Sequence, residues 1–341
     1  MKNKRKIPWV YLSLLPLLAC VFYVWGSSHW VSKDDYNRII SYDASTPAKD
    51  TLIAMTYNLG YLSGMTNNLP RERPVTLFES NLIRAKSMMG AASPDIIGFQ
   101  EIDFDSHRSK NYNQLDSLGI YHTYHQGFAS VNWDKRYVPF PYWPPSLHFG
   151  KMKSGQAILS KYPIDNIECV ILERPNEAPF WYGAFYLDRL VQIADVKIGK
   201  TIVKVLNVHL EAFYPETRRR QADVVKNLFE KYSSKMPVIL MGDFNSEPPW
   251  VEGADEVMEA ILRSDHIESA IDQKQYDTAV QKSFTSSSGE PQKMIDFILY
   301  NDNFIEKIDA RVVQEAGDIS DHFPVVMRFK FKSKNEHIIT E

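Results

Sequence analysis

Residues 236–249 read MPVILMGDFNSEPP, an apolar run that ends in an acid and an amide. An uninterrupted apolar run such as 238–241 is typical of a strand in the middle of a sheet. Asp243 and Asn245 follow it two positions apart, so in extended backbone both side chains point to the same side. Two interpretations are open at this point. The strand end aims two polar groups into a cleft, or it is a turn built from ordinary turn-forming residues.

Composition limits the class of protein. The chain has 341 residues, of which 44% are hydrophobic and 13% aromatic, enough for a sizeable core in one large domain or two ordinary ones. The net charge is −3, and no basic block occurs beyond the N-terminus, which argues against extended duplex binding. The only cysteines are Cys20 and Cys169, so a disulfide framework and a cysteine-rich zinc site are both excluded.

The N-terminal segment 1–26 differs from the rest of the chain. A basic start, MKNKRK, precedes the uncharged stretch 7–26, which has about the length that spans a bilayer. The positive end should remain in the cytoplasm, which places the following domain outside it. A second interpretation is a lipoprotein signal ending at Cys20, because LLAC resembles such a signal; a third is a cleaved signal peptide that leaves a secreted domain. Residues 27–50 are expected to be a spacer, 51–332 the catalytic domain and 333–341 a tail.

Periodicity from residue 51 onward predicts a strand-rich domain with helical crossovers. Strands are predicted at 51–59, 95–102, 119–128, 155–164, 165–173, 238–241, 294–300 and 322–331, and a hairpin over 182–213 that turns at 198–200. Helices are predicted at 77–93, 214–234 and 254–264. Hairpins mixed with crossovers predict an α/β protein with a mixed sheet or two packed sheets and helices outside.

Polar side chains interrupt the apolar runs at six of these strand ends. They are Asn58, Glu101, His209, the pair Asp243 and Asn245, Asp296, and the pair Asp321 and His322. One such interruption is ordinary, but six that are compatible with one sheet edge indicate a site. Buried carboxylates without basic partners repel one another and need a cation. Oxygen ligands without cysteine favour Mg²⁺, Mn²⁺ or Ca²⁺ over zinc.

The segments TYNL, GFQEI, NVHLEAF, GDFNSEP, MIDFILY and SDHFPV, in this order, resemble the endonuclease/exonuclease/phosphatase superfamily, which includes DNase I-like nucleases, sphingomyelinases and inositol phosphatases. The resemblance covers about residues 51–332. It implies a DNase I-like four-layer α/β sandwich, in which two mixed sheets pack face to face with helices outside. GDFN and SDH together, in this order and separation, are the most specific part of the resemblance.

The resemblance also implies a role for each site residue. Asn58 and Glu101 would hold a divalent cation, Mg²⁺ or Mn²⁺ with Ca²⁺ as a further candidate, and Asp321 would add to that shell. Asp243 would orient or deprotonate the attacking water, and Asn245 would steady the phosphoryl group. His322 would contact the phosphate, with Asp296 accepting its other ring N–H. His209 would be a second imidazole facing the phosphate.

The substrate is less well defined than the chemistry. The segment 132–155 is rich in aromatic and proline residues, and its function is either a substrate wall or a membrane-facing loop, unless it is a proline-stiffened loop packed on its own domain. The expected function is a membrane-tethered extracytoplasmic phosphodiesterase whose partner is a phosphate-ester substrate, including phospholipid or sphingolipid head groups. A nuclease acting on extracellular DNA or RNA and a non-catalytic binding protein on the same fold are the alternatives.

Overall fold

Two β-sheets form the centre of the molecule in the computed structural model, which describes residues 9–67, 69–121 and 124–332. The first sheet has seven strands in the order β1-β4-β5-β3-β2-β13-β12, and the second has six in the order β10-β11-β9-β8-β7-β6. The strands of the first sheet are β1 (Asn37–Ser41), β2 (Leu52–Asn58), β3 (Ile96–Asp103), β4 (Gln126–Val138), β5 (Gly150–Ser160), β12 (Ile305–Val312) and β13 (Val325–Phe331). Those of the second are β6 (Ile164–Ile171), β7 (Leu190–Ile198), β8 (Thr201–His209), β9 (Val238–Asp243), β10 (Ile267–Ser269) and β11 (Asp296–Asn301).

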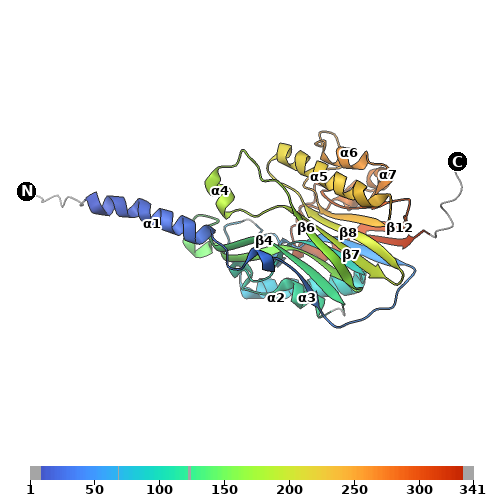
Figure 1. The fold of residues 1–341 in the computed structure, drawn as a ribbon, viewed down its shortest axis with the longest axis horizontal. Helices are drawn as coiled ribbons and strands as arrows, with labels where there is room; N and C mark the ends of the chain where they lie inside the picture. The colour runs from blue at the N-terminus through green and yellow to red at the C-terminus, as the bar shows by residue number, and fades with distance from the viewer. Residues whose placement is uncertain (1–8, 68, 122–123, 333–341) are drawn as a thin grey trace, which may run out of the picture.

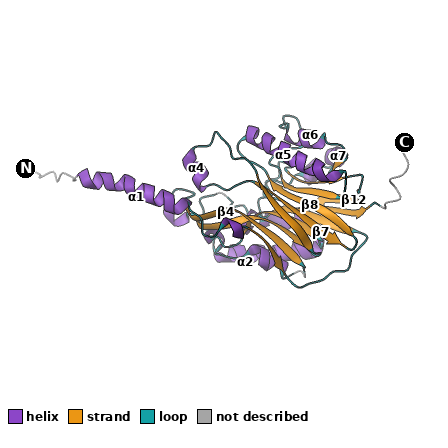
Figure 2. Ribbon diagram, viewed as in Figure 1, coloured by secondary structure: helices purple, strands orange, loops and turns teal. Residues whose placement is uncertain are grey.

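Helices cover the outer faces of the two sheets (Figures 1 and 2). α2 (Val75–Ala92) and α3 (Gln114–Gly119) lie on one side, and α5 (Pro215–Ser233), α6 (Val257–Leu262) and α7 (Gln273–Thr278) lie on the other. The remaining helices are α1 (Trp9–Ser27), α4 (Phe180–Phe185) and α8 (Val280–Ser283), and the short 3-10 turns are η1 (Lys33–Asp35), η2 (Gly60–Leu62), η3 (His107–Ser109), η4 (Pro145–Leu147) and η5 (Gln314–Ile319). The predicted four-layer α/β sandwich is therefore confirmed.

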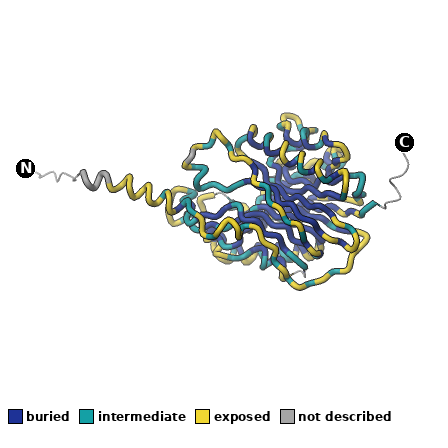
Figure 3. Tube along the Cα trace, in the orientation of Figure 1, coloured by how far each residue is buried: buried dark blue, intermediate teal, exposed yellow. Residues whose placement is uncertain are grey.

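The core lies between the sheets, where the central strands are buried on both faces (Figure 3). The continuous apolar run over 238–241 forms β9, whose six residues are all buried, as expected of a strand covered on both sides. A small polar network crosses this core: Gln100 donates to Asn207 at 2.6 Å, and Asn207 donates to Gln192 at 2.9 Å. Because buried amides need partners, this network fixes how one sheet lies on the other.

The connectivity brings the polar strand ends to one edge. β2 runs parallel to β3, and β8 runs parallel to β9, so their carboxyl ends point the same way within each sheet. β11 is antiparallel to β9, and Asp296 at its start lies opposite Asp243 at the end of β9. β13 is antiparallel to β2, so the turn that precedes it, with Asp321 and His322, lies near the end of β2.

Several predicted segments differ from the structure. The hairpin predicted over 182–213 has its first strand only from Leu190, because residues 180–185 form α4. The strand predicted over 119–128 begins only at Gln126, because α3 and its end occupy 114–119; residues 122 and 123 lie outside the described residues. The segment 132–155 is mostly the hairpin of β4 and β5, and only 139–149 is a loop. The spacer 27–50 contains β1, which pairs with β4 as an edge strand. β1 was not predicted, because its residues show no alternation of apolar and polar side chains.

The N-terminal helix α1 projects from the body of the molecule (Figures 1 and 3). Most of its described side chains are exposed. In the part of the chain that the structure describes, no helix is both long and apolar enough to cross a membrane. The first eight residues of the segment 1–26, and the tail 333–341, lie outside the described residues.

Candidate active site

Three site residues lie side by side across the second sheet. His209 ends β8 and is in register with Asp243 on β9, which is in register with Asp296 on β11. All three are buried. Gly242 precedes Asp243 with φ +150°, and a Cβ there would lie 2.0 Å from the carbonyl oxygen of Val208. Glycine at this position therefore lets β9 approach β8 closely enough to align the two site residues.

His322 enters the same place from the turn before β13. Its Nδ1 lies 2.8 Å from Oδ2 of Asp296, and its Nε2 lies 3.9 Å from Oδ2 of Asp243. Nε2 of His209 lies 3.5 Å from the same Asp243 oxygen. Asp243 is therefore faced by two imidazoles. The contact of the His322 ring with Asp296 is the one that the sequence predicts, and it fixes the ring so that Nε2 is directed toward Asp243.

The environment gives the three titratable groups different charge states. Burial raises the pKa of Asp243, and the nearby charge of Asp296 raises it further, although His322 opposes this. Burial lowers the pKa of His209 well below its usual range, and Arg189 and His322 add to the effect. Burial works in the same direction on His322, but the carboxylates of Asp296 and Asp243 outweigh it and raise its pKa. The surroundings therefore favour the neutral form of His209 and the protonated form of His322.

A second acidic group lies at the end of the first sheet. Nδ2 of Asn67 donates to Oε2 of Glu101 at 3.0 Å and to Oδ1 of Asp321 at 3.3 Å. Glu101 lies at an irregularity between β3 and β5 and has φ +49°. A positive φ at a non-glycine residue is strained and is often found at functional sites. Burial raises the pKa of Asp321, and the charge of Glu101 contributes to that shift.

Asn58 and Asn245 both contact the Asp243 side of the site. Nδ2 of Asn58 donates to Oδ2 of Asp243 at 2.9 Å, and its Oδ1 accepts the backbone N–H of Gly60 at 3.1 Å. The backbone N–H of Asn245 donates to Oδ1 of Asp243 at 2.9 Å, and its side chain donates to the carbonyl of Leu210. Asn58 therefore supports Asp243 in this structure and has no hydrogen bond to Glu101, its predicted partner at the metal.

The acidic residues fit a divalent cation in two places. Glu101 and Asp321 both accept a hydrogen bond from Nδ2 of Asn67, so their carboxylates lie close together and offer hard oxygen ligands. Ligand atoms of Asp243, Asp296 and His322 lie within 4.8 Å of one another and form the second candidate. Oδ1 of Asp296 also has no partner among the described residues. Like-charged buried carboxylates are stabilised by a cation between them, and oxygen ligands suit Mg²⁺ or Mn²⁺.

An arginine that sequence patterns do not reveal lies next to this site. Arg189 precedes β7, its side chain is buried, and Nε and Nη1 have no hydrogen-bond partner among the described residues. Nη2 donates to the hydroxyl of Tyr186 at 3.2 Å, and Nε lies 3.6 Å from Oε2 of Glu211. Val191 on β7 pairs with Val208 on β8, so Arg189 and His209 lie at neighbouring strand ends, and the charge of Arg189 lowers the pKa of His209. The sequence offers no signal for it, because a single arginine before a strand is common.

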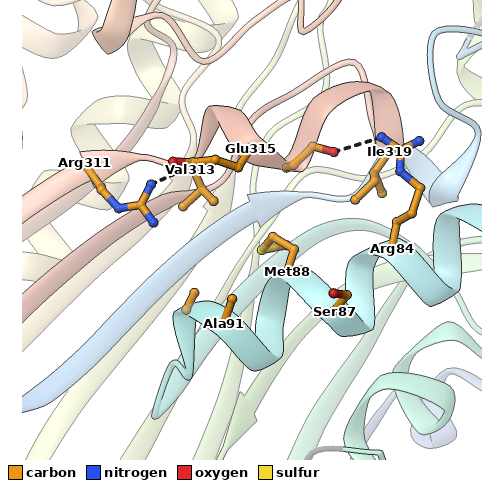
Figure 4. Close-up of a pocket in the computed structure, with 10 residues that line it drawn as sticks. Arg84, Ser87, Met88, Ala91, Arg311, Val313, Glu315 and Ile319 are labelled. Carbon is orange, nitrogen blue, oxygen red and sulfur yellow. Dashed lines mark hydrogen bonds and ion pairs between the residues drawn. The ribbon is translucent and has the colours of Figure 1, made fainter.

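Another hollow lies away from these residues. Figure 4 shows a groove of about 470 Å³ between α2 and the segment that follows β12, lined by side chains that include Arg84, Met88 and Arg311. Arg311 pairs with Glu315 at 2.8 Å, and Arg84 donates to the carbonyl of Ala316 at 3.2 Å. None of the predicted site residues lines this groove.

Residues 55–322 match the model of the endonuclease/exonuclease/phosphatase family. The chain belongs to this family. Its enzymes hydrolyse phosphate esters, so the chain is a hydrolase of the endonuclease/exonuclease/phosphatase type. A search of curated proteins found no match to the sequence.

Solved structures of this family share the fold at low sequence identity. The human Nocturnin catalytic domain with bound sulfate is 16% identical with a TM-score of 0.56, covering 87% of this chain and 98% of its own. A mannosyl-6-phosphatase of Bacteroides thetaiotaomicron is 17% identical with a TM-score of 0.56, covering 83% and 100%. Truncated TDP2 of Caenorhabditis elegans is 15% identical with a TM-score of 0.54, covering 82% and 97%. At such identities the likeness shows the fold alone.

Proposed function

We propose that this endonuclease/exonuclease/phosphatase-family hydrolase is a divalent-metal-dependent phosphodiesterase that is tethered to a membrane, with its catalytic domain outside the cytoplasm. The observation that carries the activity is the arrangement at Asp243. Two imidazoles, His209 and His322, face this carboxyl group, and the acidic group with Glu101 lies at the end of the first sheet. A base, a cationic donor and ligands for a metal are the three parts that phosphate-ester hydrolysis requires.

The protein side chains divide the work at the phosphate. Asp243 orients the attacking water and receives its proton, and Asn58 and the Asn245 amide hold this carboxylate in place. The protonated His322, whose ring is fixed by Asp296, donates to a non-bridging phosphate oxygen. The neutral His209 supplies the second imidazole contact. Donors fixed by buried partners lose little orientational freedom during reaction, which is the basis of electrostatic stabilisation.

A metal is expected at Glu101 and Asp321, whose carboxylates both lie within hydrogen-bond distance of Nδ2 of Asn67. When bound, it would offset negative charge on the phosphate. We favour this place over the Asp243, Asp296 and His322 group because His322 already uses Nδ1 to contact Asp296. Oδ1 of Asn58 would bind the metal only if it gave up the hydrogen bond that it accepts from the Gly60 amide.

Arg189 would bind a phosphate oxygen of the substrate. A buried guanidinium with two unused N–H groups carries a desolvation cost unless an anion occupies the adjoining space. Nε and Nη1 are those two groups among the described residues, and Glu211 at 3.6 Å from Nε compensates the charge only in part. A phosphate between Arg189 and His209 would satisfy these donors through charge-assisted hydrogen bonds.

The tether is proposed from the sequence of the N-terminus. The basic residues before 7–26 and the lack of charge within it favour an anchor whose positive end is cytoplasmic. Cys20 is exposed, and its lipidation is the second form of tether. Either form leaves the domain where it would meet lipid head groups or other phosphate esters, and nucleic acid outside the cell is the alternative substrate.

An activity panel tests the proposal. The full-length protein in mild detergent, with Mg²⁺, Mn²⁺ or Ca²⁺, would be assayed against bis-p-nitrophenyl phosphate, sphingomyelin, inositol phosphates and plasmid DNA. We expect metal-dependent cleavage of the diester and of a lipid head group. Faster cleavage of DNA than of any other substrate would identify a nuclease. Absence of cleavage of every substrate with every metal would favour a binding protein on the same fold.

A further inference from the structure

The C-terminal end of α1, residues 22–27, packs on the catalytic domain. The ring of Phe22 contacts that of Tyr137 with centroids 5.8 Å apart, and the ring of Tyr23 contacts that of Phe185 at 5.6 Å. A Cβ on Gly26 would lie 3.1 Å from the Phe185 ring and 3.2 Å from the Tyr137 carbonyl oxygen. Glycine thus allows a close approach at this junction. The direction of α1 is therefore set by its packing on the domain.

The chain that follows α1 strengthens this junction. Nζ of Lys135 donates to the carbonyl of Ser27 at 3.1 Å. The backbone N–H groups of Trp30 and Val31 donate to the carboxylate of Asp134 at 2.9 and 3.0 Å. Asp134 is buried, and a buried carboxylate held by two backbone donors is a stable attachment.

Exposed tryptophans gather at this end of the molecule. Trp25, Trp30, Trp143 and Trp181 are 46%, 44%, 77% and 59% exposed, and no other tryptophan with a described side chain belongs to the exposed class. Trp25 lies in α1, Trp30 just after it, Trp143 in the loop between β4 and β5, and Trp181 in α4. α1 contacts both β4 and α4, and the loop with Trp143 follows β4, so the four segments lie at the same end of the molecule.

Basic side chains lie beneath this group. The guanidinium of Arg136 is 4.9 Å from the Trp30 ring centroid, and Nζ of Lys151 is 5.3 Å from it. Tryptophan with its amphipathic ring is characteristic of the bilayer interface, and lysine and arginine there meet the phosphates of lipid head groups. Highly exposed tryptophan side chains are uncommon on soluble domains, because most of the tryptophan surface is buried in a typical fold.

The active-site residues lie toward the same edge of the sheets. In the first sheet, Ile102, next to Glu101, pairs with Gly155, and the loop 139–149 ends where β5 starts at Gly150. In the second sheet, Phe185 contacts α1, and Arg189 follows it four positions later with Tyr186 as its hydrogen-bond partner. The tryptophan-bearing segments therefore lie on the same side of the sheets as both halves of the site.

We propose that Trp25, Trp30, Trp143 and Trp181, with Tyr142, which is 66% exposed beside Trp143, form a lipid-facing rim. The rim rests on the bilayer interface into which α1 extends and turns the active-site edge toward the membrane surface. The proposal rests on the tether of the proposed function, and it commits to lipid because the uncharged stretch 7–26 continues directly from the rim. If a second copy of the chain covered the rim instead of lipid, the uncharged stretch 7–26 and the basic start would have nothing to bind.

Lipid photo-crosslinking tests the rim on the intact protein. The full-length chain would be reconstituted in phosphatidylcholine vesicles that contain a diazirine-bearing phosphatidylcholine, irradiated, and mapped by mass spectrometry. We expect labels in 139–149 and 180–185. Ile120, 70% exposed at the end of α3, lies toward the opposite edge before β4 and should remain unlabelled. The double variant Trp143→Ser, Trp181→Ser should lose the labels, and Ile120→Ser should keep them.

Three outcomes would overturn the rim. Equal labelling around Ile120 and Trp143 would show that contact is nonspecific. Cross-links between two copies of the chain in place of lipid labels would assign the surface to a dimer. If the protein does not float with the vesicles in a density gradient, both the membrane tether and the rim are wrong. Since labelling needs no turnover, a protein that is labelled as expected but hydrolyses nothing contradicts the proposed activity and leaves the rim intact.

Discussion

At the scale of single residues, the site depends on the unlike states of two histidines. His209 and His322 face the same Asp243 oxygen at 3.5 and 3.9 Å, but only His322 has a carboxylate on its far ring nitrogen. The pKa of His322 is therefore raised and that of His209 lowered. A neutral imidazole can accept a proton or a hydrogen bond, whereas a charged one donates to an anion. The same residue type thus serves two roles.

Removing either imidazole or the carboxylate should abolish most of the activity. His209→Ala, Asp243→Ala and His322→Ala should each lower kcat by ~10² or more, as expected for loss of a general acid or base or of a charge-stabilising donor. The measurement is kcat on bis-p-nitrophenyl phosphate, with circular dichroism to confirm folding. His266→Ala is the matched control, since the side chain of His266 is 60% exposed and pairs only with Asp302. A folded His322→Ala protein with wild-type kcat would refute the mechanism.

Removal of the metal should abolish the activity, and the carboxylate of Glu101 should determine how tightly the metal binds. The activity should vanish in EDTA and return with Mg²⁺ or Mn²⁺, because the buried acids of this site need a cation. Glu101→Gln removes one negative charge at nearly constant shape, so it should raise the metal concentration needed for half-maximal activity by about tenfold or more. Metal titrations measure this. Glu315→Gln, whose side chain is 73% exposed, should leave the titration unchanged. Full activity after extensive dialysis against EDTA would contradict metal dependence.

Arg189 should act on substrate binding. Arg189→Lys keeps a positive charge but loses the planar set of donors, and we expect KM to rise by about tenfold, with a smaller effect on kcat. Steady-state kinetics on a diester, with thermal melting to check the fold, measure the change. Arg219→Lys is the control, because the side chain of Arg219 is 47% exposed and pairs with Glu216. An unchanged KM in a folded Arg189→Lys protein would remove Arg189 from the site.

At the scale of elements, sequence patterns are reliable where one apolar face or run is long. The strand at 238–241, the helix at 214–234 and the hairpin turn at Gly199 are all present in the structure. The edge strand β1 was not predictable because it is mostly exposed, so its residues lack an apolar period. The polar site residues were visible because they interrupt apolar strands. Asn67 was not, because it lies in a loop and interrupts no apolar strand.

Gly242 should be essential for the pairing of β8 and β9. Its φ of +150° and a Cβ position 2.0 Å from the Val208 carbonyl oxygen leave no space for a methyl group. Gly242→Ala should therefore lower the free energy of unfolding by about 1–3 kcal/mol, the range for overpacking, and should also lower kcat by displacing Asp243. Chemical denaturation and kinetics measure both. Gly183→Ala is the control, since the nearest atom to its Cβ would be 4.0 Å away. Equal stability of the two variants would contradict this account of β9.

At the scale of the whole molecule, the two sheets explain why the site could be predicted only in part. Sequence patterns place polar residues at strand ends but do not show which sheet each strand joins. Glu101 belongs to the first sheet and Asp243 to the second, so their proximity depends on how the sheets pack. Arg189 and the contact of Asn58 with Asp243 also follow from this packing. The family resemblance supplied the expectation of two sheets, and strand periodicity alone left one mixed sheet as an alternative.

The contrast between the N-terminal stretch 7–26 and the catalytic domain leads to a prediction about where the intact protein is located. An uncharged N-terminal stretch preceded by basic residues should hold the protein in a membrane with the domain on the outer side. Fractionation should therefore find the full-length chain in membranes, and protease added to intact cells should digest the domain. Cys20→Ala distinguishes the two tethers. It should remain in membranes if 7–26 spans them, and should lose lipid and processing if LLAC is a lipoprotein signal. Recovery of the native protein in the cytosolic fraction would exclude both tethers and make an intracellular nuclease the leading alternative.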